Sequence, residues 1–307
     1  MGYTNFPHGI TSFGVPIYGV AGDVVAGNVW WVGSVKGDSW NAGVDTDGGG
    51  TKDNPFKTID YAIGKCTANN GDVIYVLPQH AETISAAAGI AADVACISII
   101  GLGNGTIRPI ITFSATASTF TVTAANVAIE NMQFQNAIDS LVSGISITAA
   151  GCSIKGCEFS QPTSTNDALI WILTTAAADD LTIQGNIFRA SHAGPTEAIR
   201  LVGTDRANIL DNYLIGSWST AAINAITTAC LEILIARNTI SNSVTDKLAI
   251  DLVAACTGRI EYNSGTVVST AGISDAAIID AANCQLAQNY FSDAAGETGK
   301  LIGTVSA

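Results

Sequence analysis

The sequence predicts an all-β fold, a right-handed parallel β-helix, from two observations. First, a short phrase recurs seven times between Ile129 and Phe291, with its first residues 25, 29, 26, 26, 25 and 26 positions apart. A repeat of this length is one structural unit that must stack on its neighbours to bury its apolar face. Second, apolar residues two apart lead the phrases, such as Leu181 and Ile183, which is the alternation of a half-buried strand. The phrases are Ile129–Phe134, Ile154–Phe159, Ile183–Phe188, Ile209–Leu214, Ile235–Ile240, Ile260–Gly265 and Leu286–Phe291.

An asparagine stands three residues into the phrase in five of the repeats. These residues are Asn186, Asn212, Asn238, Asn263 and Asn289. Asparagine tolerates a tight backbone turn and can pass amide hydrogen bonds to the coils above and below. We therefore predict a structural ladder of asparagines, and we expect Asn242, which lies outside this register, to contribute little.

A second strand precedes most of the phrases, as in Leu169–Leu173, Ala198–Val202 and Ala249–Val253. The phrase also satisfies the leucine-rich-repeat pattern, whose period is about 20–29 residues. A leucine-rich repeat uses its other half for a helix or a 3₁₀ segment. Here that half is β-branched and punctuated by Gly, Ser and Thr, without a helical period. We favour the β-helix, with the leucine-rich repeat as the alternative.

The β-helix domain is expected to span residues 51–291, with a capping helix at about 55–66 and a C-terminal tail at 292–307. Asn54 and Pro55 supply an N-cap and a proline at the first helical position. Apolar residues then recur on one helical face, at Phe56, Ile59, Ile63 and Cys66. A short amphipathic helix over the open end is the cap that a solenoid requires.

Residues 1–50 form an irregular, aromatic-rich arm. The candidate partner contacts in it are Tyr3, Phe6, Phe13, Tyr18, Trp30 and Trp31. Clusters of exposed aromatic side chains mark interfaces. The arm therefore either docks on a partner or packs back on the flank of the solenoid.

The composition restricts the classes of partner and cofactor. A net charge of −13 argues against nucleic acid, which would require clustered Lys and Arg. No apolar run is long enough to span a membrane, and residues 1–10 do not resemble a secretion signal. The seven cysteines contain no C-x-x-C pair and are expected to be small buried thiols. We predict no cofactor and no metal site.

The adjacent carboxylates Asp179 and Asp180 are the candidate catalytic pair. Asp180, Arg206 and Glu232 all lie three residues before their phrases, so they should stack with alternating sign on successive coils. Asp211 and Arg237 align in the same way and should form a second ion-pair ladder. Coils of 25–26 residues also leave little chain for the loops of a cleft. We therefore expect no catalytic residues and a protein that is not an enzyme.

Three segments carry a resemblance to a known family: Asp53–Ile63, Gly71–Pro78 and Ile99–Thr112. They resemble the pectate-lyase-like right-handed β-helix proteins, in the non-enzymatic form found among structural proteins of tailed phages. The likeness covers about residues 27–291. It implies a virion protein made in the host cytoplasm, most simply a trimeric capsid decoration protein attached by its arm to a capsid or other virion protein. The alternative is a tailspike-like or adhesin β-helix that binds or cleaves surface polysaccharide.

Overall fold

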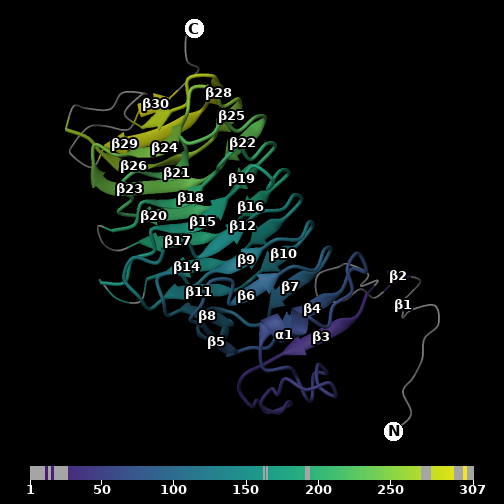
Figure 1. The fold of residues 1–307 in the computed structure, drawn as a ribbon. Coiled ribbons are helices and arrows are strands. Elements are labelled where there is room, and N and C mark those ends of the chain that lie inside the picture. Colours follow the sequence, from purple (N-terminus) through teal and green to yellow (C-terminus); the bar gives the residue numbers. More distant parts are fainter. Residues whose placement is uncertain are drawn as a thin grey trace.

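The chain is a right-handed parallel β-helix in which each coil contributes one short strand to each of three sheets (Figure 1). The computed structural model describes residues 11–12, 15–16, 27–161, 163, 165–190, 194–270, 278–293 and 300–302. The three sheets contain 10, 10 and 8 strands, and we call them the first, second and third sheets in the order in which a coil visits them. The third side of each coil is a β-strand, where a leucine-rich repeat would have a helix or a 3₁₀ segment. The β-helix prediction is therefore confirmed over the leucine-rich repeat.

The first sheet consists of β3 (Val29–Val32), β4 (Val73–Val76), β7 (Ser98–Gly101), β10 (Ala128–Glu130), β13 (Ser153–Lys155), β16 (Thr182–Gln184), β19 (Asn208–Leu210), β22 (Ile233–Ala236), β25 (Gly258–Glu261) and β28 (Cys284–Ala287). The second sheet consists of β5 (Ala81–Ile84), β8 (Ile110–Phe113), β11 (Gln133–Asn136), β14 (Glu158–Ser160), β17 (Ile187–Ala190), β20 (Tyr213–Gly216), β23 (Thr239–Thr245), β26 (Ser264–Val268), β29 (Asn289–Asp293) and β30 (Lys300–Ile302). The third sheet consists of β6 (Ile90–Ala92), β9 (Phe120–Val122), β12 (Ile145–Ile147), β15 (Ile170–Thr174), β18 (Glu197–Arg200), β21 (Ala221–Ala225), β24 (Leu248–Leu252) and β27 (Ile279–Asp280). Outside these sheets, β1 (Thr11–Ser12) pairs with β2 (Val15–Pro16), and η1 (Gly105–Ile107) is a 3₁₀ turn.

The core is built from inward columns in which equivalent residues of successive coils lie in register. Ile129, Ile154 and Ile183 pair directly on the first sheet and are buried. On the second sheet the ring centroids of Phe134 and Phe159 are 5.1 Å apart, and those of Phe159 and Phe188 are 4.5 Å apart, in stacked geometry. This repetition explains why the apolar alternation in the sequence predicts the fold, because each inward position packs on its own copy one coil away.

The N-terminal end of the stack differs from the sequence prediction. The helix α1 covers only Ile59–Ile63 instead of about 55–66, and its N-cap is Thr58, whose hydroxyl accepts the Tyr61 N–H at 3.3 Å. Phe56 is extended rather than helical, because its N–H donates to Trp31 and its carbonyl accepts from Gly33, both at 2.8 Å. Tertiary pairing therefore overrides the helical signals of Asn54 and Pro55.

Both predicted domain boundaries cut through the solenoid. Strand β3 pairs in parallel with β4, so the first sheet begins inside residues 1–50, which the sequence assigns to the arm. At the other end β29 reaches Asp293, and β30 pairs with it in the antiparallel sense. No helix in the described part of the chain has the length and apolarity needed to cross a membrane.

Candidate functional site

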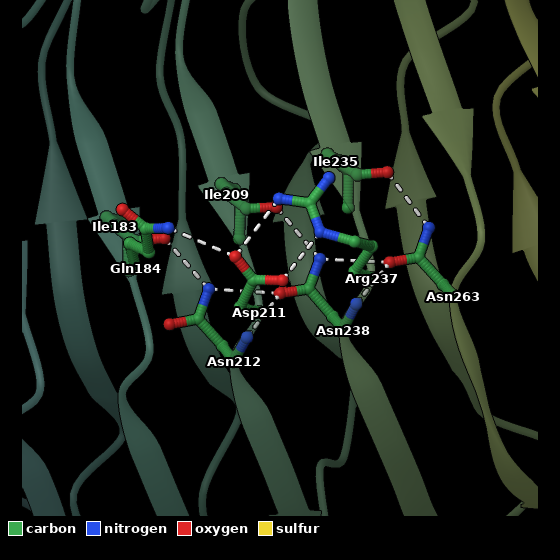
Figure 2. Close-up of polar contacts among 9 residues, drawn as sticks. All are labelled: Ile183, Gln184, Ile209, Asp211, Asn212, Ile235, Arg237, Asn238 and Asn263. Carbon is green, nitrogen blue, oxygen red and sulfur yellow. Dashed lines mark hydrogen bonds and ion pairs between the residues drawn. The ribbon is translucent and has the colours of Figure 1, made fainter.

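The five predicted ladder asparagines are buried and lie in one column, and Figure 2 shows three of them, Asn212, Asn238 and Asn263. The first four lie in two-residue turns between the first and second sheets, and Asn289 begins β29. The Nδ2 group of Asn238 donates to the Ile209 carbonyl and to Asn263 Oδ1, each at 2.9 Å. The N–H of Asn238 donates to the same Asn263 oxygen at 2.9 Å. Asn212 binds Asn238 in the same way, from its N–H at 2.9 Å and its Nδ2 at 3.0 Å. From Asn186 to Asn289 the column is therefore a continuous hydrogen-bonded structure.

The expectation for Asn242 is wrong. This side chain is buried, and its Oδ1 accepts the N–H groups of Trp218 and Val244 at 3.1 Å each. Its Nδ2 donates to the carbonyls of Trp218 and Leu248 at 3.0 Å each. The cause is an irregularity that sequence periodicity does not show, since β23 extends to Thr245 and shifts its register against β26 after Ser241.

The candidate catalytic carboxylates belong to exposed ion-pair ladders. Arg206 contacts Asp180 at 2.6 Å and Asp179 at 3.2 Å, and Arg237 contacts Asp211 at 2.6 Å. Hydrogen bonds from the guanidinium groups lower the pKa of Asp180 and of Asp211. Glu232, which the sequence places in the first ladder, forms no ion pair within the described residues, because Arg206 turns to the two aspartates of the preceding coil.

The six aromatic residues proposed as partner contacts divide into two groups. Tyr3, Phe6, Phe13 and Tyr18 lie outside the residues whose side chains the structure describes. Trp30 packs against the core, with its ring centroid 5.6 Å from that of Phe56. Trp31 lies on the outer face beside Tyr75, at 5.0 Å between centroids. The two tryptophans therefore contact the chain's own first sheet.

A second polar column runs along the outer face of the third sheet. Arg200, Asn224, Asp251 and Asp280 are direct register partners on β18, β21, β24 and β27. Each follows an inward isoleucine by one residue, so the alternation of the strands places the four side chains on the opposite, outer face. We call these four residues the third-sheet column.

Within the described residues, only the first member of this column, Arg200, forms an ion pair. Arg200 Nη2 contacts both carboxylate oxygens of Glu197 at 2.8 Å, and Thr196 Oγ1 donates to Glu197 at 2.7 Å. Asn224 is completely buried, and its Oδ1 accepts the Ile226 N–H at 3.0 Å. Its Nδ2 group, in contrast, is a buried donor without a partner. Buried polar groups without partners are rare in folded proteins and require an explanation.

Asp251 and Asp280 place two carboxyl groups side by side with no ion-pair partner in the described part of the chain. Burial raises the pKa of Asp251 above its ordinary value, and the nearby charges of Asp280 and Glu197 raise it further. A carboxyl group with a raised pKa, next to one that is exposed, can donate or accept a proton or hydrogen bond. Within the described residues, no group of three or more His, Cys, Asp or Glu side chains is arranged to hold a metal ion.

The sequence contained a signal for this column that periodicity alone did not reveal. The second strand of each repeat is visible in the sequence, as in Ala198–Val202 and Ala249–Val253, but the polar residue inside it does not recur at one constant interval. The intervals between the four residues are 24, 27 and 29, because the turns flanking the third sheet vary in length. When the strands of the third sheet are aligned on their inward isoleucines, the four residues fall into one column.

Comparison with known proteins finds no matching family model and no matching curated protein. Among solved structures, the chain is similar to one titled rhamnogalacturonan lyase, with 15% sequence identity, a TM-score of 0.45, and coverage of 79% of this chain and 74% of that chain. This similarity concerns the β-helix fold, which is the part of the resemblance that the structure confirms.

The matched protein is an enzyme, and this finding overturns the prediction that the chain is not one. That prediction considers only Asp179, Asp180 and the short turns. It does not consider the side chains on the outer face of the third sheet. A likeness at this identity assigns no catalytic residue to the chain, so the chemistry must come from its own side chains.

Proposed function

We propose that this protein is a β-helix component of a tailed-phage virion that binds neutral surface polysaccharide along the third-sheet column. The observation that supports it most is the row of polar register partners on the outer face, in which the half-buried Asp251 and the exposed Asp280 have no ion-pair partner among the described residues. Groups of this kind are satisfied when water or a ligand supplies a hydrogen-bond partner.

The chemistry of the column matches that of sugar hydroxyl groups, which both donate and accept hydrogen bonds. Arg200 supplies donors, and the exposed carboxylate of Asp280 supplies acceptors. The carboxyl of Asp251, whose pKa is raised by burial and by the charges of Asp280 and Glu197, adds a further acceptor. The net charge of −13 disfavours an acidic polysaccharide by long-range repulsion, which is why we propose a neutral one.

The test is retention of the full chain on immobilised neutral capsule or cell-wall polysaccharide from candidate hosts. Asp251→Ala and Asp280→Ala should each weaken retention at least about tenfold, the equivalent of one hydrogen bond of about 1.4 kcal/mol. Glu232→Gln, an exposed carboxylate at a turn, should bind like the natural protein. Equal retention of all four proteins would refute the site. Following the same samples for new reducing ends or unsaturated sugars tests whether the column also cleaves its ligand.

For its place on the virion we propose the capsid surface, where the chain would act as a trimeric decoration protein attached to a capsid protein. The resemblance of the three sequence segments supports this placement. We assign the attachment to residues 1–26, which precede the closure of the described N-terminal end by β3 and α1. Deleting residues 1–26 should preserve a β-rich circular-dichroism spectrum and cooperative melting. It should also remove the protein's density from images of intact particles; full occupancy without these residues would contradict the placement.

A further inference from the structure

A pocket of about 490 Å³ lies on the outer face of the first sheet, away from the third-sheet column. Its floor is formed by Tyr75 on β4, Ile100 on β7 and Glu130 on β10. Its wall is the connection that follows β7, at residues 102–104. A concave site of this volume, with an apolar floor and a few polar groups, is typical of small-molecule binding sites.

The pocket arises from a difference in turn length between neighbouring coils. Residues 102–109 connect β7 to β8, whereas only residues 131 and 132 connect β10 to β11. The longer connection therefore protrudes beside the shorter one. Asn131 fixes it in place, because its Nδ2 group donates to the carbonyls of Gly101 at 2.7 Å and Gly103 at 2.9 Å. Gly103 has a φ of +97°, which a residue with a side chain rarely adopts.

Three polar side chains that line this pocket have no hydrogen-bond or ion-pair partner among the described residues. They are the hydroxyl of Tyr75, the amide of Asn104 and the half-buried carboxylate of Glu130. Asn104 stands at the N-cap of η1, yet its side chain makes no capping hydrogen bond. Glu130 is the register partner of Lys155 but forms no ion pair with it. These groups are therefore available to a ligand.

We propose that this pocket binds a single neutral sugar unit. A pyranose ring presents a C–H face to the apolar floor of Tyr75 and Ile100, and hydroxyl groups to the surrounding polar side chains. The carboxylate of Glu130 can accept two hydroxyl hydrogen bonds, while Asn104 and the Tyr75 hydroxyl can each donate and accept. The site goes beyond the proposed function, because it lies on a different sheet and shares no residue with the third-sheet column.

The test uses methyl glycosides of glucose, galactose and N-acetylglucosamine, added at millimolar concentration to the full-length ¹⁵N-labelled protein. Binding should shift the amide resonances of residues 101–104 and 130–131 for at least one glycoside. Glu130→Gln and Asn104→Ala should each weaken that binding at least about threefold, and Tyr75→Phe should weaken it through loss of the hydroxyl alone. Glu232→Gln is the matched carboxylate control and should leave binding unchanged.

Asp251→Ala separates this site from the proposed polysaccharide site, since it should leave the pocket shifts intact. The absence of shifts at residues 101–104 with all three glycosides would overturn the inference. Glycoside binding by Glu130→Gln and by Asn104→Ala with the same affinity as by the natural protein would overturn it as well. Loss of polysaccharide retention in Asp251→Ala, with these shifts preserved, would mean that both sites are present.

Discussion

Two polar columns run along the same stack of coils, and they differ in how completely they are paired. In the asparagine column four of the five buried amides donate to the asparagine of the next coil, as Asn212 does to Asn238 and Asn238 does to Asn263. In the third-sheet column the register is just as direct, yet Asn224 keeps an unpaired donor and Asp251 faces another carboxylate. The contrast indicates that a column which satisfies itself supports the fold, whereas one that does not is available for ligand binding.

The largest effect should come from interrupting the asparagine column at its middle. Asn238→Ala removes the partner of the Ile209 carbonyl and the acceptor for both donors of Asn212, all of them buried. Each buried group left unpaired costs about 1–3 kcal/mol, so unfolding in urea should show a loss of at least this size.

Two controls sharpen this test. Asn208→Ala removes a half-buried amide whose one hydrogen bond is to Arg206, at 3.2 Å, and should change the stability little. Asn289→Ala, at the end of the column, should cost less than Asn238→Ala, because Asn289 passes no amide hydrogen bond to a further asparagine within the described residues. Equal costs for all three variants would contradict the column as a cooperative structure.

A smaller effect of opposite sign is expected in the third-sheet column. Asp251→Asn should raise the melting temperature at neutral pH, because a pKa raised by burial and by two carboxylates means that folding disfavours the ionised form. The gain should shrink as the pH falls through the raised pKa and disappear below 3.8, where the carboxyl is neutral in the folded and unfolded chain alike. Thermal melting across that range measures it, with the exposed Asp53→Asn as the control. A lower melting temperature for Asp251→Asn at neutral pH would show that the column is paired after all.

The smallest effect is expected from the exposed ion-pair ladder. Arg237→Gln removes the hydrogen bond that lowers the pKa of Asp211, so it should lower the melting temperature slightly above pH 3.8. The difference should vanish in acid, as Asp211 becomes protonated through its lowered pKa, and should shrink at high salt. A difference that persists in acid and in high salt would point to packing of the Arg237 stem instead.

The sequence predicted the asparagine column and the core because their register is almost constant. Ile183, Asn186 and Phe188 recur at intervals of 25–26 residues through most of the stack, and each interval fixes a contact with its own copy. The third-sheet column could not be predicted from the sequence, because its residues change type from Arg200 to Asp280 and the intervals between them follow turns of unequal length. The pocket beside Tyr75 could not be predicted from the sequence either, since it depends on the difference in length between two adjacent turns. The start of α1 was misplaced because the pairing of Phe56 with Trp31 is a tertiary contact.

The reversed strand β30 has a consequence for assembly. A stack of parallel coils has no natural end, because each edge strand offers the same pattern of N–H and C=O groups to a further coil. Pairing Lys300–Ile302 with Asn289–Asp293 in the antiparallel sense occupies that edge with a strand of the wrong polarity for another coil. Removing residues 300–302 would expose β29 as a template, and end-to-end polymers seen by light scattering would be the expected result. A short strand of opposite direction thus closes the last edge of the second sheet to a further parallel strand.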